Sequence, residues 1–244
     1  MRELTVAGLK VRIAGGDDRE GGGTGPLVVL LHGFGAPGED LVSLYRQIDA
    51  PHSVRFAFPA APLDLGSTLG RQYAGARAWW MIDFAMLDPN ARASLPDRSR
   101  SVPDGLVEAR TTVTAFLAEL MRTLDAKPDQ TILGGFSQGS MLSLDVALHS
   151  DVAFGGLILM SSTVLNLNEW EPLLPKLRGV PVLQSHGRSD AVLPFDAAER
   201  LRDLLKNAGA ELTWVEFGGG HAIPNGVLDA ASAMITKLAG ESAD

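Results

Sequence analysis

The chain has 244 residues, of which 45% are hydrophobic and 20% charged, and a formal net charge of −8. This length and composition predict one large soluble α/β domain with a substantial buried core. The acidic balance argues against a nucleic-acid partner, which needs clustered Lys and Arg, and against attraction to anionic membranes. Because the chain contains no cysteine, disulfides, thiolate zinc sites and a cysteine nucleophile are excluded.

The first segment of the chain carries charges and no long apolar run. Met1–Lys10 contains three charged side chains, so we expect no signal peptide. The longest apolar segments, Leu27–Leu31 and Gly155–Met160, have the length of strands and fall far short of the roughly 20 residues of a membrane span. We therefore expect a cytoplasmic protein without stable membrane insertion.

The N-terminal part predicts strands joined by loops. Leu4–Ile13 alternates around Gly8, which is typical of a hairpin at a sheet edge. The glycine-rich stretch Gly15–Gly25 could be a phosphate loop, but no helix start follows it and its carboxylates would repel phosphate. We interpret it as a connection between strands. Leu27–Leu31 then predicts a strand buried on both faces.

A short helix and a long irregular segment follow. Glu39–Ile48 is predicted to be helical and Val54–Phe58 to be a strand. The stretch 60–104 contains several prolines, two tryptophans and poor periodicity. We interpret it as a long excursion over the active face, because long structured loops in compact domains are usually functional.

The rest of the chain alternates between the two kinds of element. Asp104 is expected to cap a helix over Val107–Leu124. The later segments are Thr131–Gly134, Ser140–His149, Gly155–Met160, Val180–Ser185, Ala197–Ala208, Leu212–Phe217 and Val227–Leu238. Repeated β-α-β units predict a mainly parallel central sheet with helices on both faces. Without an internal repeat or linker, residues 1–244 are predicted to form a single α/β domain.

The most informative motif is Gly135-Phe-Ser-Gln-Gly139, between a predicted strand and a predicted helix. A serine with glycines two residues before and after it is typical of a nucleophile elbow, a tight strand-to-helix turn. Side chains at the glycine positions would collide with neighbouring backbone. The turn exposes the hydroxyl of Ser137 above the positive end of the following helix. We predict Ser137 as a nucleophile.

A serine hydroxyl needs a base, and the base needs an acid that orients it. Asp190 follows the predicted strand Val180–Ser185, and His221 stands behind three glycines after Leu212–Phe217. The order Ser, Asp, His, with each residue after a strand, is one of the known arrangements of this triad. All three loops can meet at one edge of a parallel sheet. We predict Asp190 as the acid and His221 as the base.

Two other aspartates are rival acids. Asp145 lies two turns into the helix after the elbow, where its side chain would point away from the strand ends. Asp196 is expected to cap the helix that starts near Ala197. Both positions make them poorer partners for a base than Asp190.

The other histidines have simpler interpretations. His52 and His149 are at positions where a solvent-facing residue would be unremarkable, and His186 lies in the loop of the acid itself. His32 is expected to brace its own loop through hydrogen bonds. No histidine shows metal-ligand spacing such as H-E-x-x-H.

The tetrahedral intermediate of acyl transfer needs two hydrogen-bond donors for its oxyanion. One is expected from the backbone N–H of Gln138, the residue after the nucleophile. The other is expected from the loop after Leu27–Leu31, with the N–H of Phe34 as the best candidate.

These motifs together resemble the phospholipase/carboxylesterase family of α/β-hydrolases, which includes small bacterial carboxylesterases and acyl-protein thioesterases. The segments that carry the resemblance are Leu31-His-Gly-Phe-Gly35, Arg77-Ala-Trp79-Trp80, Gly135-Phe-Ser-Gln-Gly139, Gly187-Arg-Ser-Asp190 and Gly219-Gly-His221. The resemblance implies the α/β-hydrolase fold and hydrolysis of small-molecule esters or thioesters with no cofactor and no metal. It also implies that Trp79 and Trp80 line the acyl pocket. Residues 88–102 are longer than expected for a minimal member, which leaves the acyl-chain preference open.

The leading hypothesis is a serine carboxylesterase for small or medium acyl esters. A lysophospholipase or an acyl-protein thioesterase would need a long apolar groove, to which residues 79–87 offer apolar side chains. A peptidase is neither required nor excluded. A non-catalytic binding protein with the same fold would usually lack a triad member. The sequence leaves the oligomeric state open, a homodimer included.

Overall fold

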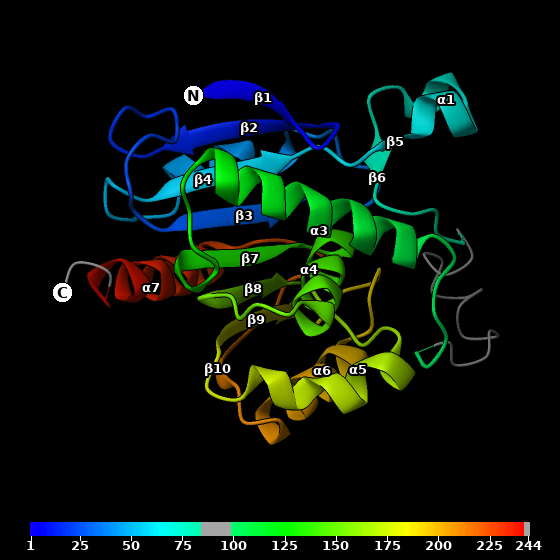
Figure 1. Ribbon diagram of the computed structural model, residues 1–244. Helices are drawn as coiled ribbons and strands as arrows, with labels where there is room; N and C mark the ends of the chain where they lie inside the picture. Colours follow the sequence, from blue (N-terminus) through cyan, green and yellow to red (C-terminus); the bar gives the residue numbers. More distant parts are fainter. Residues whose placement is uncertain (84–98, 242–244) are drawn as a thin grey trace.

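A computed structural model describes residues 1–83 and 99–241 of the chain (Figure 1). Its centre is an eight-stranded sheet in the order β1-β2-β4-β3-β7-β8-β9-β10. The strands are β1 (Arg2–Val6), β2 (Leu9–Gly15), β3 (Leu27–Leu31), β4 (Arg55–Pro59), β7 (Thr131–Phe136), β8 (Gly156–Met160), β9 (Pro181–Gly187) and β10 (Glu211–Phe217). In this order, each neighbouring pair from β4 through β3, β7, β8 and β9 to β10 is parallel. β1 and β2 form the predicted antiparallel hairpin at one edge, and β2 pairs antiparallel with β4. The predicted mainly parallel sheet is confirmed.

Helices cover both faces of this sheet, as predicted (Figure 1). The longer ones are α3 (Leu106–Thr123), α4 (Gln138–His149), α6 (Phe195–Asn207) and α7 (Asn225–Glu241), with the shorter η1 (Asp40–Arg46), η4 (Pro128–Gln130), α5 (Leu167–Leu173) and η5 (Leu174–Leu177) between them. One core cluster joins α3, α4, α5 and α6 to the sheet, and a second joins η1 and α7 to the other face.

Strand β3 explains why a continuous apolar run forms a central strand here. Its five residues are all buried. Leu27, Val29 and Leu31 pack in the α3–α6 cluster, whereas Val28 and Leu30 pack in the η1–α7 cluster. Since neighbouring side chains of a strand point to opposite faces, a strand covered on both sides needs apolar residues at every position.

Part of the segment after β4 has short regular elements that the sequence did not predict. β5 (Leu63–Asp64) pairs antiparallel with β6 (Arg77–Ala78), and α1 (Leu65–Leu69) and η2 (Arg71–Tyr73) lie between them. Figure 1 places β5, β6 and α1 beyond the end of β4. Elements of two to five residues are too short to show periodicity. Residues 84–98 lie outside the described residues. They include part of the excursion predicted at 60–104 and most of the segment 88–102.

The short helix expected at 39–48 is present as the 3₁₀ helix η1. Two other local expectations were wrong. Helix α3 begins after Gly105, whose φ of 84° suits glycine, so Asp104 is not the residue that precedes the first turn. Helix α6 begins after Pro194, and Asp196 lies inside its first turn, where its carboxylate accepts a hydrogen bond from the N–H of Ala197.

Candidate active site

Ser137 stands at the turn between β7 and α4 in a strained conformation, with φ 54° and ψ −119°. A positive φ is costly for a non-glycine residue and often marks a functional site. A Cβ at Gly135 would lie 2.3 Å from the carbonyl oxygen of Leu31, and one at Gly139 would lie 2.1 Å from the same atom. Both glycines are therefore required, because the turn passes directly against the end of β3.

Asp190 and His221 are hydrogen-bonded to one another. The Nδ1–H of His221 donates to Oδ2 of Asp190 at 2.7 Å. The other carboxylate oxygen accepts from the backbone N–H groups of Val192 at 2.8 Å and Leu193 at 2.9 Å. With Asp190 only 8% exposed, this set of donors fixes the carboxylate and leaves Nε2 of His221 as the basic nitrogen.

The same contacts keep the Asp190 carboxylate charged. Burial by itself raises the pKa of a carboxyl group, but the hydrogen bond from His221 and those from Leu193 and Val192 outweigh burial and hold the pKa of Asp190 below its usual value. An ionised carboxylate beside Nδ1–H is the arrangement that fixes the tautomer of an imidazole base.

The loop that carries His221 is held against the loop of Asp190. The N–H of Arg188 donates to the carbonyl of Phe217 at 2.8 Å, and that of Ser189 donates to Gly219 at 3.0 Å. A Cβ at Gly187 would lie 2.3 Å from the carbonyl oxygen of Gly220. The loops of Asp190 and His221 thus approach at backbone distance, which explains the glycine at 187.

His221 also reaches the nucleophile turn. Its ring packs on that of Phe136, the residue before Ser137, with ring centroids 4.6 Å apart. The part of the chain that the structure describes holds no hydrogen bond between the hydroxyl of Ser137 and His221. Such bonds are often long in a substrate-free enzyme and tighten with substrate. The structure therefore brings Ser137, Asp190 and His221 together at one edge of the sheet.

The loop after β3 passes beside Ser137. A Cβ at Gly33 would lie 3.3 Å from that of Ser137; Phe34 is the next residue of this loop, and Gln138 begins α4 directly after the serine. His32 braces the loop, as expected. Its Nδ1–H donates to the carbonyl of Gly33 at 2.8 Å, and its Nε2 accepts from the N–H of Ala61 at 3.0 Å.

Burial lowers the pKa of His32, and the two partners of its ring define the neutral tautomer. Its two occupied nitrogens fit a structural role. The sequence had suggested this role without the partner, because Ala61 lies in the segment after β4 and gives no local signal.

The side chain of Gln138 has a function that sequence reasoning missed. Its Oε1 accepts from the N–H of Trp79 at 3.0 Å, and its Nε2 donates to the carbonyl of Trp80 at 2.8 Å. The indole Nε1–H of Trp79 donates to the carbonyl of His32 at 2.9 Å. Both tryptophans are buried, at 2% and 3% exposure, and they support the loops around Ser137. That they line an acyl pocket stays a prediction.

His186, in the loop of the acid, is fully buried. Its Nε2 lies 3.0 Å from the carbonyl of Leu193, to which it donates, and 3.4 Å from Oδ2 of Asp190. Burial lowers the pKa of His186, so the ring is neutral and does not compete as a cation for Asp190. It secures the turn whose N–H groups bind the carboxylate.

The rival acid Asp145 is engaged elsewhere. Its carboxylate accepts from Nε of Arg110 at 2.6 Å and from the indole Nε1–H of Trp170 at 2.8 Å. His149 is not a plain solvent-facing residue, since Nδ1 donates to the carbonyl of Asp145 at 2.8 Å and Nε2 lies 3.2 Å from Glu169. His52 is exposed, as expected.

Asp145, His149 and Glu169 could geometrically hold a metal ion. The guanidinium of Arg110, however, binds Asp145 at 2.6 Å and Glu169 at 2.7 Å. It already supplies the positive charge that these carboxylates need, and it would repel a cation. We interpret this group as a structural ion-pair network.

No helix in residues 1–83 and 99–241 is long and apolar enough to cross a membrane.

Comparison with known proteins agrees with this geometry. The model of the Phospholipase/Carboxylesterase family matches residues 20–239. The chain is 27% identical to acyl-protein thioesterase 1 of Neurospora crassa over 89% of this chain and 88% of that protein. It is 30% identical to acyl-protein thioesterase 1 of Eremothecium gossypii over 85% of each chain. The crystal structure of esterase PE8 superimposes with a TM-score of 0.77 and 28% identity over 94% of this chain and 99% of that one. The chain therefore belongs to the Phospholipase/Carboxylesterase family of α/β-hydrolases and is a serine hydrolase.

Proposed function

We propose that the protein is a carboxylesterase that cleaves small to medium acyl esters with Ser137, His221 and Asp190 as its triad. The observation that carries the proposal is the 2.7 Å hydrogen bond between His221 and Asp190. The ring of His221 also packs on Phe136, the residue before Ser137, with ring centroids 4.6 Å apart. An oriented imidazole near a serine with a positive φ supports acyl transfer by these residues.

In the first step, Nε2 of His221 takes the proton of Ser137 while Oγ attacks the ester carbonyl. The resulting oxyanion accepts hydrogen bonds from the N–H groups of Phe34 and Gln138. The intermediate collapses, His221 gives its proton to the leaving alcohol, and an acyl-serine remains. Water, deprotonated by His221, attacks this ester and releases the acid and the free hydroxyl. Asp190 stabilises the imidazolium in both steps.

An acyl-protein thioesterase is the second candidate, because two relatives with this activity in their names match most of the chain. The same triad can attack a thioester carbonyl, so the geometry of the site fits both reactions. A lysophospholipase is a further possibility within the same chemistry. Matched oxyesters and thioesters of increasing acyl length, together with a lysolipid, would separate these activities in one assay series.

The nucleophile assignment predicts that Ser137→Ala lowers kcat by about six orders of magnitude. The assay is hydrolysis of a p-nitrophenyl ester, with Ser43→Ala as a matched control on the exposed side of η1. A serine-directed fluorophosphonate should label the native protein and Ser43→Ala but not Ser137→Ala. Activity of Ser137→Ala within about tenfold of the native enzyme would refute the assignment, provided that thermal unfolding shows it to be folded.

A further inference from the structure

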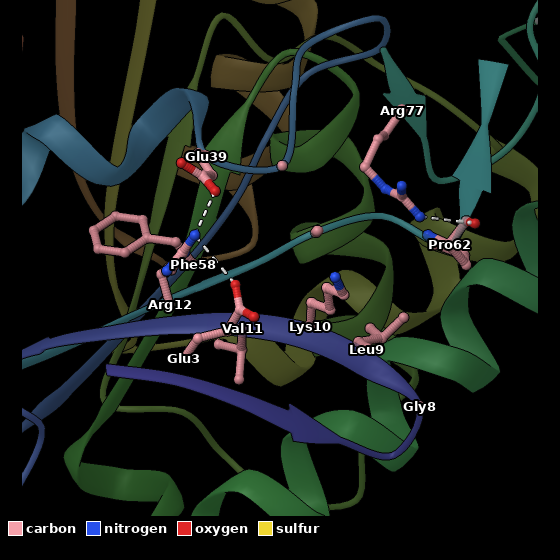
Figure 2. A pocket seen from close by; sticks show the side chains of 12 residues that line it. Glu3, Gly8, Leu9, Lys10, Val11, Arg12, Glu39, Phe58, Pro62 and Arg77 are labelled. Atoms are coloured by element: carbon pink, nitrogen blue, oxygen red, sulfur yellow. Dashed lines mark hydrogen bonds and ion pairs between the residues drawn. The ribbon is translucent and has the colours of Figure 1, made fainter. Parts of the chain in front are cut away.

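A cavity of about 610 Å³ lies at the end of β4, beside the loop that passes Ser137 (Figure 2). Its walls come from the β1–β2 hairpin, the start of η1, the residues after β4, and Arg77 of β6. The size is within the range of small-molecule sites. The carboxyl ends of parallel strands share one edge of a sheet, so the cavity opens on the same edge as the nucleophile.

The charges in this cavity are unequally paired. Arg12 contacts both acidic side chains of the lining, Glu39 at 2.6 Å and Glu3 at 3.2 Å. Lys10 and Arg77 have no carboxylate partner within residues 1–83 and 99–241. In Figure 2, the side chains of Arg77 and Lys10 both lie apart from the Glu39–Arg12–Glu3 contacts.

The residues that follow β4 contact both the backbone of Lys10 and the guanidinium of Arg77. The carbonyl of Lys10 accepts from the N–H of Ala60 at 2.8 Å, and Nε of Arg77 donates to the carbonyl of the next residue, Ala61, at 2.5 Å. A second Arg77 nitrogen, Nη2, donates to Pro62 at 3.2 Å. A guanidinium has five N–H donors, so these bonds to carbonyls orient Arg77 without neutralising its charge.

The loop after β3 runs from Ser137 to the cavity. Gly38 lines it, whereas Gly33, at the other end of the same loop, abuts Ser137. The backbone of Arg77 pairs with this loop through Gly35 N–H at 2.9 Å and through the carbonyl of Ala36 at 3.0 Å. A ligand group bound in the cavity would lie at one end of this loop, and an ester at Ser137 would lie at the other end.

We propose that this cavity is a subsite for a carboxylate or phosphate group carried by the ester substrate, with Lys10 and Arg77 as its cations. The inference rests on the proposed esterase function. In a protein of net charge −8, two cations that have no carboxylate partner in the described part of the chain would favour an anionic substrate locally. The substrate class is then an ester with a free acidic group in its acyl or alcohol part.

Hydrolysis rates of two pairs of esters test this subsite, one pair of p-nitrophenyl esters and one pair of alkyl esters. Each pair compares a free carboxylate with its methyl ester, at the end of the acyl chain in one pair and on the alcohol in the other. We expect kcat/KM to favour the carboxylate on the order of tenfold in one pair, which corresponds to one modest charge interaction. Lys10→Glu should abolish or reverse that preference. The matched variant Lys127→Glu should keep this preference. Lys127 lies just before the amino end of β7, whereas Ser137 follows the carboxyl end of that strand.

Calorimetric titration with inorganic phosphate tests the anion site without any turnover. The native protein and Lys127→Glu should bind phosphate with equal affinity, and Lys10→Glu at least about tenfold more weakly, by the same charge argument. Phosphate affinity unchanged in Lys10→Glu, or no carboxylate preference in either ester pair, would overturn the subsite while Ser137-dependent hydrolysis of neutral esters upheld the proposed function. Absence of that hydrolysis would refute the function, and the phosphate titration would still decide whether the cavity binds anions.

Discussion

Asp145 and Asp190 are both buried and both lie beside a histidine, yet their partners differ in kind. Asp145 is neutralised by the permanent cation Arg110 and by the indole of Trp170. Asp190 receives two backbone N–H groups and the imidazole of His221. A guanidinium cannot give up its proton in proteins, so the first carboxylate can only hold structure together. The second one is bonded to an imidazole, a side chain that can take up and release a proton as a base.

The two histidines repeat this difference. Both nitrogens of His149 are engaged, one by the carbonyl of Asp145 and the other by Glu169. In His221 only Nδ1 is hydrogen-bonded within the described part of the chain, which leaves Nε2 for the proposed reaction. A buried Asp–His pair is therefore informative about catalysis only when the second nitrogen has no structural partner.

Asp190→Asn should have the largest effect that distinguishes the two regions. An amide can donate a hydrogen bond to Nδ1 and so stabilise the wrong tautomer of His221, as in triad enzymes generally. We expect kcat to fall about 10⁴-fold with a folded protein. The measurement is ester hydrolysis combined with thermal unfolding. A loss of less than about tenfold would show that Asp190 does not orient the base.

Asp145→Ala should instead damage stability. Removing one partner of a buried ion pair leaves Arg110 partly uncompensated, which costs about 3–5 kcal/mol of unfolding free energy. Because this network lies away from His221, the folded fraction should keep kcat within a few-fold of the native value. Urea unfolding and hydrolysis at a temperature well below the transition measure the two effects separately.

A milder variant of the same network provides the matched control. Glu169 is 37% exposed at its side chain, and Glu169→Gln should cost only up to about 1 kcal/mol, as exposed ion pairs do. If Glu169→Gln and Asp145→Ala destabilised the protein equally, the buried Asp145–Arg110 contact would not be the part that holds these helices together.

The sequence predicted one of these two regions much better than the other. The elbow of Ser137 has a local signature, because the close approach of the Leu31 carbonyl demands glycine at 135 and 139. The bonds from Arg110 and Trp170 to Asp145 join residues 35 and 25 positions apart, and no short pattern announces them. For the same reason Asp145 could be recognised as a poor acid without its partners being known.

The same limit applies to the fold. Continuous apolar runs such as Leu27–Leu31 identify strands buried on two faces, so the central sheet was predictable. The short elements β5, α1 and β6 have no periodicity, and α5, with seven residues and Pro172 inside, gives no helical signal. The cavity beside Arg77 depends on how the N-terminal hairpin meets these short elements, which only the tertiary structure shows.

The smallest expected effect is the pH dependence of stability at Asp190. Its folded-state pKa lies below the usual value, so the contacts of the charged carboxylate stabilise the fold above the unfolded pKa of about 3.9. That contribution is lost as pH falls from this value through the lower pKa of the folded state. The difference in unfolding free energy between the native protein and Asp190→Asn should therefore shrink as pH falls below about 4. Urea unfolding below about pH 5 measures it. A difference that instead grew as pH fell through this acidic range would mean that the pKa of Asp190 is raised on folding, and that burial, and not the bond to His221, dominates at this carboxylate.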